Sequence, residues 1–261
     1  MKISIFYKDS ELSNIICNKI TILAKEKGFT FSDSSPDVVF YVGGDGTFLR
    51  AVQKHRNRLD KIKFIGIHCG HLGFFYDYGV EEVEQAFSDL LDENYKLGSY
   101  PLLKGVLNYK DGSTKNIYAI NEIRIENPFH TLISDVLIDE SLFEKFRGNG
   151  LVVASPLGSS AYNKSLGGAL ITSDLSLLQI TEIAPIQNKS SKSIGSSLIL
   201  NGDKKIQFVG DLNKVVVGYD HLTSDISNLV KVEVTLMSNQ IKVIHKNEYS
   251  HLARLRESFT E

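Results

Sequence analysis

Five consecutive residues, Gly43-Gly44-Asp45-Gly46-Thr47, combine the residue types that bind phosphate with a single carboxylate. Backbone N–H groups in a glycine-rich turn at a helix N-terminus point at a bound anion, and the helix dipole favours negative charge there. Glycines also let the main chain turn sharply and approach a ligand closely. Because Asp45 would repel phosphate, we expect it to accept a proton from an attacking hydroxyl or to hold a metal. The alternative is a plain glycine turn in which Asp45 caps a helix.

Two later stretches also carry residue types suited to a ligand. Asn121-Glu122 lies in a strand-like context. An amide beside a carboxylate can grip a ribose diol, because the amide both donates and accepts and the carboxylate accepts twice. An exposed strand end is the plainer interpretation of this pair alone. The stretch 155–168 is dense in hydroxyl residues and glycine and contains one aromatic ring. This density favours a ligand loop, although hydroxyl side chains also form turns.

Short apolar runs at 3–6, 38–42 and 64–67 predict strands in the first hundred residues. Helical patterns alternate with these runs, which favours a parallel sheet covered on both faces. In such sheets ligands collect beyond the carboxyl ends of the strands. The glycine-containing loops 43–47 and 70–73 both follow strands, so they could line one crevice.

Two helices are predicted in this part of the chain. The first begins at a cap on Asp9 or Ser10 and ends near Gly28. Its apolar face is expected to carry Leu12, Ile15, Ile16, Ile20 and Leu23. The second follows the glycine turn and extends to about Asn57.

Paired strand patterns replace this alternation after Tyr100-Pro101. The runs 102–109 and 115–125 flank Asp111-Gly112, which strongly indicates a hairpin. A second hairpin is predicted for 231–236 and 241–245, with its turn at Ser238-Asn239. Further strands are expected at 132–138, 142–146 and 151–153. The pattern is typical of an antiparallel sandwich. Helical spacing returns at Leu252, Leu255 and Phe259, which we expect to pack back on a domain.

Composition limits the functional class. The 261 residues are enough for two modest domains or one large one. A formal net charge of −2 and a pI near 6.4 offer no electrostatic argument for nucleic acid or an anionic membrane. Two cysteines, no apolar run of membrane-spanning length and no signal peptide lead us to expect a cytoplasmic protein.

Several familiar catalytic motifs are absent from the sequence. There is no P-loop and no G-x-S-x-G elbow. His68 and His71 lack the further ligands of a zinc site; His71 is interpreted as a possible phosphate or hydroxyl donor. Asp220-His221 could make a polar contact at the site, with a surface turn as the plainer interpretation.

The motifs together resemble the NAD kinase family in its compact bacterial form. The resemblance rests on 43–47, 70–74, Asn121-Glu122 and the loop 155–168, in this order and spacing, and it covers nearly the whole chain. The glycine–aspartate motif alone is shared with diacylglycerol and sphingosine kinases. Its combination with Asn121-Glu122 and 158–162 is much more specific.

The resemblance implies a fold and an assembly. A Rossmann-like α/β domain at 1–100 carries the glycine–aspartate motif, and the segment 251–261 is expected to pack back. An antiparallel β-sandwich at 101–250 binds the dinucleotide. Small-molecule nucleotides are the implied partners, and the family's usual assembly is a homotetramer.

The implied reaction is transfer of the γ-phosphoryl group of ATP to the 2′-hydroxyl of the adenosine ribose of NAD, giving NADP. Asp45 would orient that hydroxyl and accept its proton. Mg²⁺ or another divalent metal would bridge the phosphoryl oxygens, and no residue is assigned as its ligand. Arg147 could come from a neighbouring subunit. The resemblance assigns nucleotide contacts to Gly44, Gly46, His71, Leu72, Phe74, Asn121, Glu122, Arg147, Asn149, Ser160, Ala161, Tyr162, Ser165, Ala184 and His221.

Two positions depart from the family pattern. Asn149 stands where an aspartate is usual, and that aspartate is expected to contact the nicotinamide carboxamide. Loss of a charge-assisted hydrogen bond would cost about 1–2 kcal/mol of binding. Leu157 replaces a small polar residue. Two alternatives stay open: a lipid kinase that shares the glycine motif, and a dinucleotide sensor without turnover.

Overall fold

The computed structural model describes residues 1–70, 73–212, 215–224 and 227–260, apart from the side chain at 239. Contacts divide the chain into two compact units. Unit 1 comprises Met1–Tyr100 and Asn239–Glu261, and unit 2 comprises Pro101–Ser238. The domain boundaries expected at 101 and 250 stay predictions. In the described part of the chain, no helix is long and apolar enough to cross a membrane.

Unit 1 is an α/β layer structure built on a parallel sheet. Its strands follow the order β2-β1-β3-β4-β17, with β5 beside β4. The elements are β1 (Lys2–Tyr7), α1 (Glu11–Glu26), β2 (Thr30–Phe31), β3 (Val38–Gly43), α2 (Asp45–Lys54), β4 (Lys63–His68), β5 (Tyr78–Gly79), α3 (Val83–Leu91), the end of β17 (Leu229–His245) and α5 (His251–Phe259).

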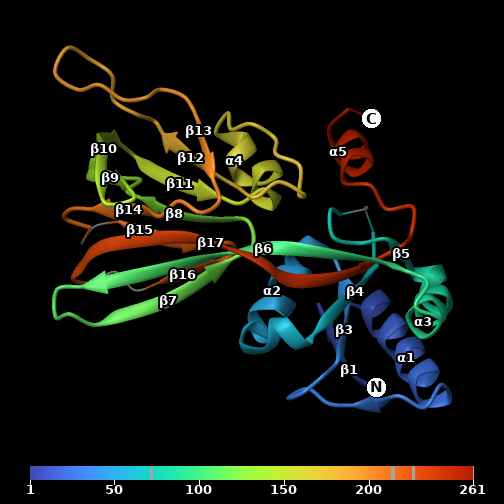
Figure 1. Cartoon of the computed structure of the whole chain (residues 1–261). Coiled ribbons are helices and arrows are strands. Elements are labelled where there is room, and N and C mark those ends of the chain that lie inside the picture. The colour runs from blue at the N-terminus through green and yellow to red at the C-terminus, as the bar shows by residue number, and fades with distance from the viewer. Residues whose placement is uncertain (71–72, 213–214, 225–226, 261) are drawn as a thin grey trace. The chain divides into compact units, whose positions relative to one another are not determined.

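Both faces of β3 are buried, which explains its uninterrupted apolar run. Alternate residues point to opposite faces of the sheet. Phe40 belongs to the core formed with α1 and α3, where it stacks on Phe87 at 4.8 Å between ring centroids. Tyr41 faces α2 and lies 5.0 Å from Phe48. Figure 1 shows α2 on one side of β3 and β4, with α1 and α3 on the other.

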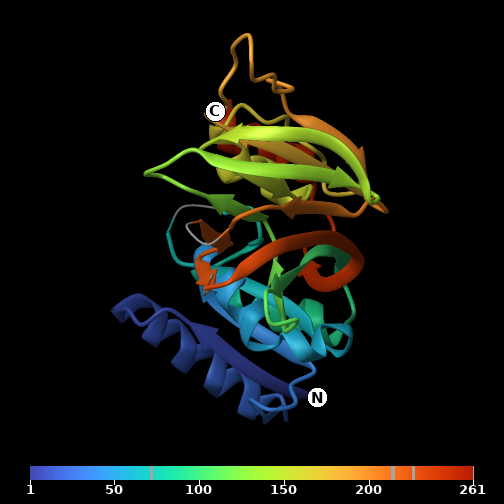
Figure 2. The same ribbon diagram turned by 90° about the vertical axis from the view of Figure 1, so that its left-hand side faces the viewer.

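Helix α1 begins and ends where the sequence predicts. Ser10 caps it by accepting the N–H of Ser13 at 3.2 Å, and Gly28 follows it with φ +77°. Figure 2 shows α1 running alongside β1. The predicted apolar face is partly wrong. Leu12 and Ile15 are exposed. The buried stripe consists instead of Ser13, Ile16, Cys17, Ile20 and Ala24. Helix α2 ends at Lys54 instead of near Asn57, and a 3₁₀ segment, Arg56–Lys61, follows.

Unit 2 is antiparallel, and its described strands form two sheets. One follows the order β10-β9-β14-β17, with β6 beside β17 and β7 beside β6. The other follows β13-β12-β11-β8-β15-β16. The elements are β6 (Lys96–Tyr109, which begins in unit 1), β7 (Thr114–Ala119), β8 (Glu122–Glu126), β9 (Leu132–Ile138), β10 (Ser141–Gly148), β11 (Gly150–Ala154), α4 (Tyr162–Ser165), β12 (Leu177–Ile183), β13 (Leu198–Asn201), β14 (Ile206–Val209), β15 (Val216–Tyr219) and β16 (Leu222–Ser224).

Residues of both sheets form one apolar core, including Leu103 and Phe208 from the first sheet and Ile123 and Val153 from the second. The predicted fold class, an α/β domain followed by an antiparallel β-sandwich domain, is therefore confirmed. The hairpin around Asp111-Gly112 is also confirmed as β6–β7.

The second predicted hairpin is wrong. β17 runs without a turn through Ser238-Asn239. Residues 231–234 pair antiparallel with β14, whereas 242–244 pair parallel with β4. Residues 231–236 alternate because Val232 and Val234 face the core of unit 2, whereas Ile241, Val243 and Ile244 are all buried. The polar residues between the two halves mark the boundary of the units. The run 115–125 is likewise two strands, β7 and β8, interrupted at Ile120-Asn121.

Gly66 on β4 allows the ring of Tyr41, on the neighbouring strand β3, to pack closely against the β4 backbone. A Cβ at this position would lie 2.6 Å from Cζ of Tyr41 and 2.7 Å from its hydroxyl oxygen. We expect Gly66→Ala to lower the free energy of unfolding by about 1–3 kcal/mol through overpacking, measured by chemical denaturation. Gly79→Ala is the control, since Gly79 has a negative φ and a Cβ there would lie no closer than 3.4 Å to another atom. Equal stability of the Gly66→Ala variant and the unaltered chain would contradict this account.

Candidate active site

The glycine turn places Asp45 as the first residue of α2, directly after β3. Gly43 has φ +149°, and a Cβ there would lie 2.4 Å from Oγ1 of Thr47. Only glycine fits this position without strain. Gly44 and Gly46 are exposed, and no atom lies within 4 Å of the place that a Cβ would take on either one. Space is therefore open beside the backbone of the turn.

Backbone amides of a neighbouring segment bind the Asp45 carboxylate. The N–H of Phe74 donates to Oδ2 at 3.2 Å, and the N–H of Phe75 donates to Oδ1 at 3.4 Å. Gly73 makes this approach possible, because a Cβ there would lie 2.3 Å from Oδ1. Burial raises the pKa of Asp45, while the two amides and the more distant charge of Arg254 oppose the rise. The carboxylate is thus fixed in direction and is more basic than a solvated one.

Two tyrosines fix this segment against the glycine turn and β3. Tyr76 donates its hydroxyl to the carbonyl of Gly44 at 2.6 Å. Tyr41 donates its hydroxyl to the carbonyl of Phe75. Since both tyrosine rings are fully buried, these bonds have little competition from water. The turn, Asp45 and the segment 73–76 form one connected assembly within unit 1.

In unit 2, Asn121 lies in the short break between β7 and β8, and its backbone is held by Asp220. The carboxylate of Asp220 accepts the N–H of Ile120 at 2.9 Å and the N–H of Asn121 at 2.8 Å. The N–H of Asp220 donates to the carbonyl of Glu122 at 3.1 Å. Asp220 occupies the β15–β16 turn with φ +48°. The turn therefore brings a buried carboxylate onto the two amides that precede Glu122.

The loop 155–168 holds the other side of Asn121. Ser155 donates its N–H to the Asn121 carbonyl at 2.9 Å and its hydroxyl to the Ile120 carbonyl at 2.5 Å. Gly158 packs so closely that a Cβ would lie 1.9 Å from the Asn121 carbonyl oxygen. The break at Asn121 and this loop therefore form one local structure.

A pocket of about 380 Å³ lies next to this structure, lined by Glu122, Arg124, Glu126, Tyr162 and Asp220. The first three alternate along β8 and share one face, while Ile123 and Ile125 point into the core. Arg124 bridges the two glutamates, at 3.3 Å from Glu122 and 3.2 Å from Glu126.

An aromatic ring completes the pocket. Tyr162 donates its hydroxyl to Glu126 at 3.0 Å, and its ring lies 5.5 Å from the guanidinium carbon of Arg124. The pocket therefore offers carboxylate acceptors, one cation and one ring that is 37% exposed.

The carboxyl groups of this pocket are unusually basic. Burial raises the pKa of Glu122 to about 7, helped by the nearby Asp220 and opposed by Arg124. Burial also raises the pKa of Asp220 to about 6, against the amide bonds that favour its charged form. Oε2 of Glu122 is buried without a hydrogen-bond partner in the described structure. Such an acceptor is suited to a ligand hydroxyl.

Many hydroxyls of the loop 155–168 form bonds within the protein. Ser159 accepts the N–H of Ile171 at 2.9 Å, and Ser160 donates to the Leu157 carbonyl at 3.1 Å. Part of the serine density therefore has a structural cause. Leu157, the apolar replacement, is itself buried.

Asn149 has a structural partner of its own. Its side-chain amide donates to the carbonyl of Asn127 at 3.0 Å. An ionised aspartate could not make this bond, because it has no hydrogen to donate. Ala184, with φ +44°, lies beside the same turn, since its carbonyl would be 2.8 Å from a Cβ on Gly148. The N–H of Ile186 donates to the carbonyl of Arg147 at 2.8 Å. The structure thus brings Arg147, Asn149 and Ala184 together.

The remaining predicted residues are dispersed or outside the description. Ser165 ends α4, Ala161 precedes it, and His221 follows Asp220 in an exposed turn. His71 and Leu72 lie outside the described residues. Sequence reasoning missed Arg124 and Glu126, although their alternation with Glu122 on one strand was a usable signal.

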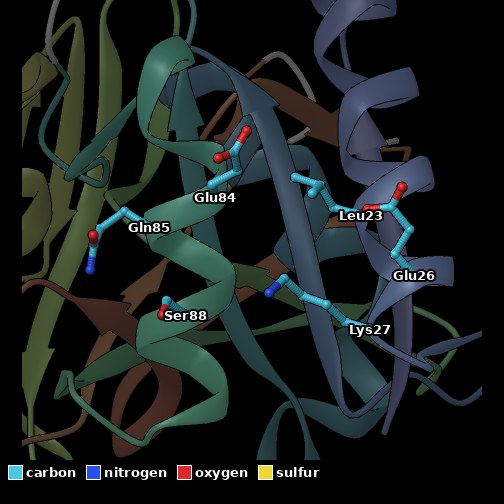
Figure 3. Close-up of a pocket in the computed structure, with 6 residues that line it drawn as sticks. All are labelled: Leu23, Glu26, Lys27, Glu84, Gln85 and Ser88. Atoms are coloured by element: carbon cyan, nitrogen blue, oxygen red, sulfur yellow. The ribbon is translucent and has the colours of Figure 1, made fainter.

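A separate surface pocket of about 460 Å³ lies between α1 and α3. Figure 3 shows Leu23 and Glu26 from α1, with Lys27 directly after it, opposite residues of α3. None of the predicted site residues lines it. We assign it no ligand.

Asp220 offers a test of this geometry. Asp220→Asn keeps the size of the side chain but removes its charge and one acceptor oxygen. Even if the remaining oxygen accepts both amides, their bonds lose the charge assistance, and the new NH2 group faces the N–H of Ile120. We expect the free energy of unfolding to fall by about 1–3 kcal/mol, measured by chemical denaturation at neutral pH. Asp203→Asn, at an exposed turn, is the matched control. Equal stability of both variants would contradict the assigned role.

Comparison with known proteins identifies the family. The model of the ATP-NAD kinase N-terminal domain matches residues 6–95, and that of the ATP-NAD kinase C-terminal domain matches 120–246. An NAD kinase from Leuconostoc mesenteroides is 36% identical over 252 residues, covering 97% of this chain and 94% of the relative. NAD kinase 1 from Halalkalibacterium halodurans is 35% identical over 262 residues, covering 99% and 98%.

Solved structures share the fold. Yeast NADH kinase, crystallised with NADH, has a TM-score of 0.85 at 20% identity, covering 99% of this chain and 87% of that chain. An NAD kinase from Archaeoglobus fulgidus, in complex with ATP, has a TM-score of 0.78 at 19% identity, covering 98% of both chains. The two domain models and the near-full-length relatives together show that this chain belongs to the ATP-NAD kinase family.

Proposed function

We propose that this chain transfers the γ-phosphoryl group of ATP to the 2′-hydroxyl of the adenosine ribose of NAD, forming NADP and ADP. Family membership supports the activity, since relatives that match this chain over nearly its whole length are named NAD kinases. The observation that carries the chemistry is the Asp45 carboxylate, directed by the Phe74 and Phe75 amides beside an open glycine turn.

Asp45 acts as the proton acceptor in this proposal. Phosphoryl transfer depends mainly on positioning and charge neutralisation, with one group orienting the nucleophile. Burial raises the pKa of Asp45, which strengthens it as a base. The proton of the ribose hydroxyl passes to this carboxylate as the oxygen bonds to the γ-phosphorus and the bond to ADP breaks.

The glycine turn binds phosphate through its backbone. Gly44 and Gly46 have open space and lie at the N-terminus of α2, where amides and dipole favour an anion. A divalent metal, Mg²⁺ being the usual one, would supply charge neutralisation for the phosphoryl oxygens. No cluster of three or more His, Cys, Asp or Glu in the described chain could hold a metal alone. This donor set fits a metal bound largely by substrate phosphates and water.

In unit 2, Asn121 and Glu122 grip the adenosine ribose through amide and carboxylate hydrogen bonds. The unpaired buried oxygen of Glu122 supports this role. Tyr162 and Ser165 contact the other half of the dinucleotide, and Ala161 allows a close backbone or apolar approach. The remaining assigned contacts are Ser160, Arg147, Asn149, Ala184, His221, Phe74, His71 and Leu72.

The assembly and the compartment complete the proposal. We infer a homotetramer in which Arg147 reaches a neighbouring subunit. A cytoplasmic location is supported by Cys17 and Cys69, which are both free thiols. The lipid-kinase alternative is not favoured by the relatives, and turnover separates an enzyme from a sensor.

Asp45→Asn tests the role of the base. With Mg²⁺, ATP and NAD, the unaltered protein should form NADP, detected by a coupled NADP-specific dehydrogenase. Removing the proton acceptor should lower kcat about 10²–10⁴-fold. Chelation of the metal should stop the reaction. Asp60→Asn, an exposed position in unit 1, is the matched control.

The outcomes of this test are distinct. An Asp45→Asn variant with undiminished kcat would overturn the assigned role. If the unaltered protein makes no NADP but is stabilised thermally by NAD, it is a sensor. Absence of both effects would reject dinucleotide as the ligand.

Glu122 predicts a pH dependence of NAD binding. Its pKa is about 7, and the ionised form can accept a hydrogen bond from the ribose 3′-hydroxyl at the unpaired Oε2, whereas protonation removes one acceptor. KM for NAD should therefore rise as pH falls from about 8 to about 6. In Glu122→Gln, KM should match the acid-side value and stay flat across this range. KM profiles of equal shape in both proteins would contradict the assignment.

A further inference from the structure

Helix α5 packs against the rest of unit 1 through a buried arginine, in addition to the ring contacts of His251 and Phe259 with Phe74. Arg254 is the one buried residue of this fully described helix, at 8% exposure. Leu252 is 65% exposed and Phe259 is 39% exposed. Arginine is rarely buried unless its charge is paired, so its contacts identify what the helix is attached to.

The guanidinium of Arg254 binds the segment that follows the Asp45 amides. Its Nη2 donates to the carbonyl of Tyr76 at 2.9 Å and to Oδ1 of Asp77 at 2.7 Å. Its Nη1 donates to Glu257, one turn further along α5, at 3.4 Å. One nitrogen thus joins a backbone carbonyl and a carboxylate on neighbouring residues, and both bonds carry the arginine's charge.

Asp77 is fixed from its other side by a second buried group. Its Oδ2 binds Nδ1 of His245, at the end of β17, and both side chains are at most 4% exposed. Nε2 of His245 lies 2.6 Å from the hydroxyl of Tyr100. The ring of Tyr249 stacks on His245 at 3.8 Å between centroids. The carboxylate of Asp77 therefore has little freedom to move.

The same short segment directs Asp45. Phe74 and Phe75 donate their N–H groups to the Asp45 carboxylate, and Tyr76 bonds to the Gly44 carbonyl. Tyr76 and Asp77, which Arg254 binds, come directly after those amides in the chain. Only the φ and ψ angles of Phe75 and Tyr76 separate the N–H of Phe75 from the carbonyl of Tyr76, so a shift of this carbonyl changes the direction of the preceding amides.

From this chain of contacts we propose that Arg254 is a positioning residue for the phosphoryl transfer. By holding the Tyr76 carbonyl and Asp77, it keeps the amides of Phe74 and Phe75 directed at the carboxylate of Asp45. The catalytic consequence rests on the proposed function, whereas the geometric one does not. Arg254 itself touches no reacting atom.

Arg254→Met tests this role, because methionine keeps much of the buried volume but removes the charge and the donors. A base displaced by about 1 Å can cost up to 10²-fold in rate, so we expect kcat to fall roughly tenfold or more. KM for ATP and NAD should change little. Hydrogen exchange followed by mass spectrometry should show faster exchange in a peptide spanning 73–77.

Two further variants sharpen the comparison. Glu257→Gln removes a partner of the same arginine, on the same helix, without touching 73–77; its kcat and exchange should match those of the unaltered protein. Arg254→Lys keeps the charge but cannot reproduce the planar donor geometry, so its kcat should be intermediate. If Arg254→Met does not fold, Arg254→Lys is used in its place for every measurement.

The outcomes separate this inference from the proposed function. A lowered Tm with unchanged kcat per folded molecule and unchanged exchange at 73–77 would mean that Arg254 only docks the helix, and would overturn the inference. Equal losses in Glu257→Gln would overturn it as well. If the unaltered protein makes no NADP, faster exchange at 73–77 in Arg254→Met alone still supports the positioning role, although the proposed function has failed.

Discussion

The site in unit 1 depends on one interaction: a partly buried carboxylate, Asp45, that faces two backbone amides. Burial disfavours its charge and the hydrogen bonds favour it. Burial is the larger effect, because the pKa of Asp45 is raised overall. The bonds therefore serve mainly to fix direction. This arrangement suits a group that must take a proton at one defined place. It also requires glycine at position 73, because a side chain there would collide with the Asp45 carboxylate.

Unit 2 contains a similar arrangement of a carboxylate and backbone amides, with a different role. Asp220 also directs a buried carboxylate at consecutive amides, and here the amides belong to the segment that carries Asn121 and Glu122. In both units a backbone segment is held by a side chain from a distant part of the sequence. Asp45 and the segment that carries Asn121 thus owe their positions to main-chain hydrogen bonds, whereas Glu122, Arg124, Glu126 and Tyr162 contact one another.

Much of the fold followed from local patterns, and the long-range pairs did not. The run 38–42 predicted a buried strand because both of its faces are covered, and Ser10 and Gly28 marked the ends of a helix. The hairpin predicted within β17 was wrong. Strand-like runs on either side of a polar Ser238-Asn239 occur both in a hairpin and in one long strand that changes its pairing partner. Which strand pairs with each half is decided by tertiary packing.

The candidate site was predictable to a similar degree. Asp45 and Glu122 stood out by residue type, and the structure places each beside the groups described above. Arg254 did not stand out, because its partner Tyr76 lies 178 residues away and the helix that carries it showed an apolar spacing. Asp220 was noticed only as part of Asp220-His221, as a polar contact at the site or a surface turn, since no local signal reveals the two amides that its carboxylate accepts.

The most direct test of the account is the position of the transferred phosphate. Phosphorus-31 NMR of the products formed from ATP and NAD by the unaltered protein distinguishes a 2′-phosphomonoester from its 3′ isomer and from inorganic phosphate. We predict one new monoester signal, coincident with that of authentic NADP and growing in step with ADP. ADP with inorganic phosphate alone, or a monoester on the 3′-oxygen, would contradict the alignment of Asp45 with the 2′-hydroxyl.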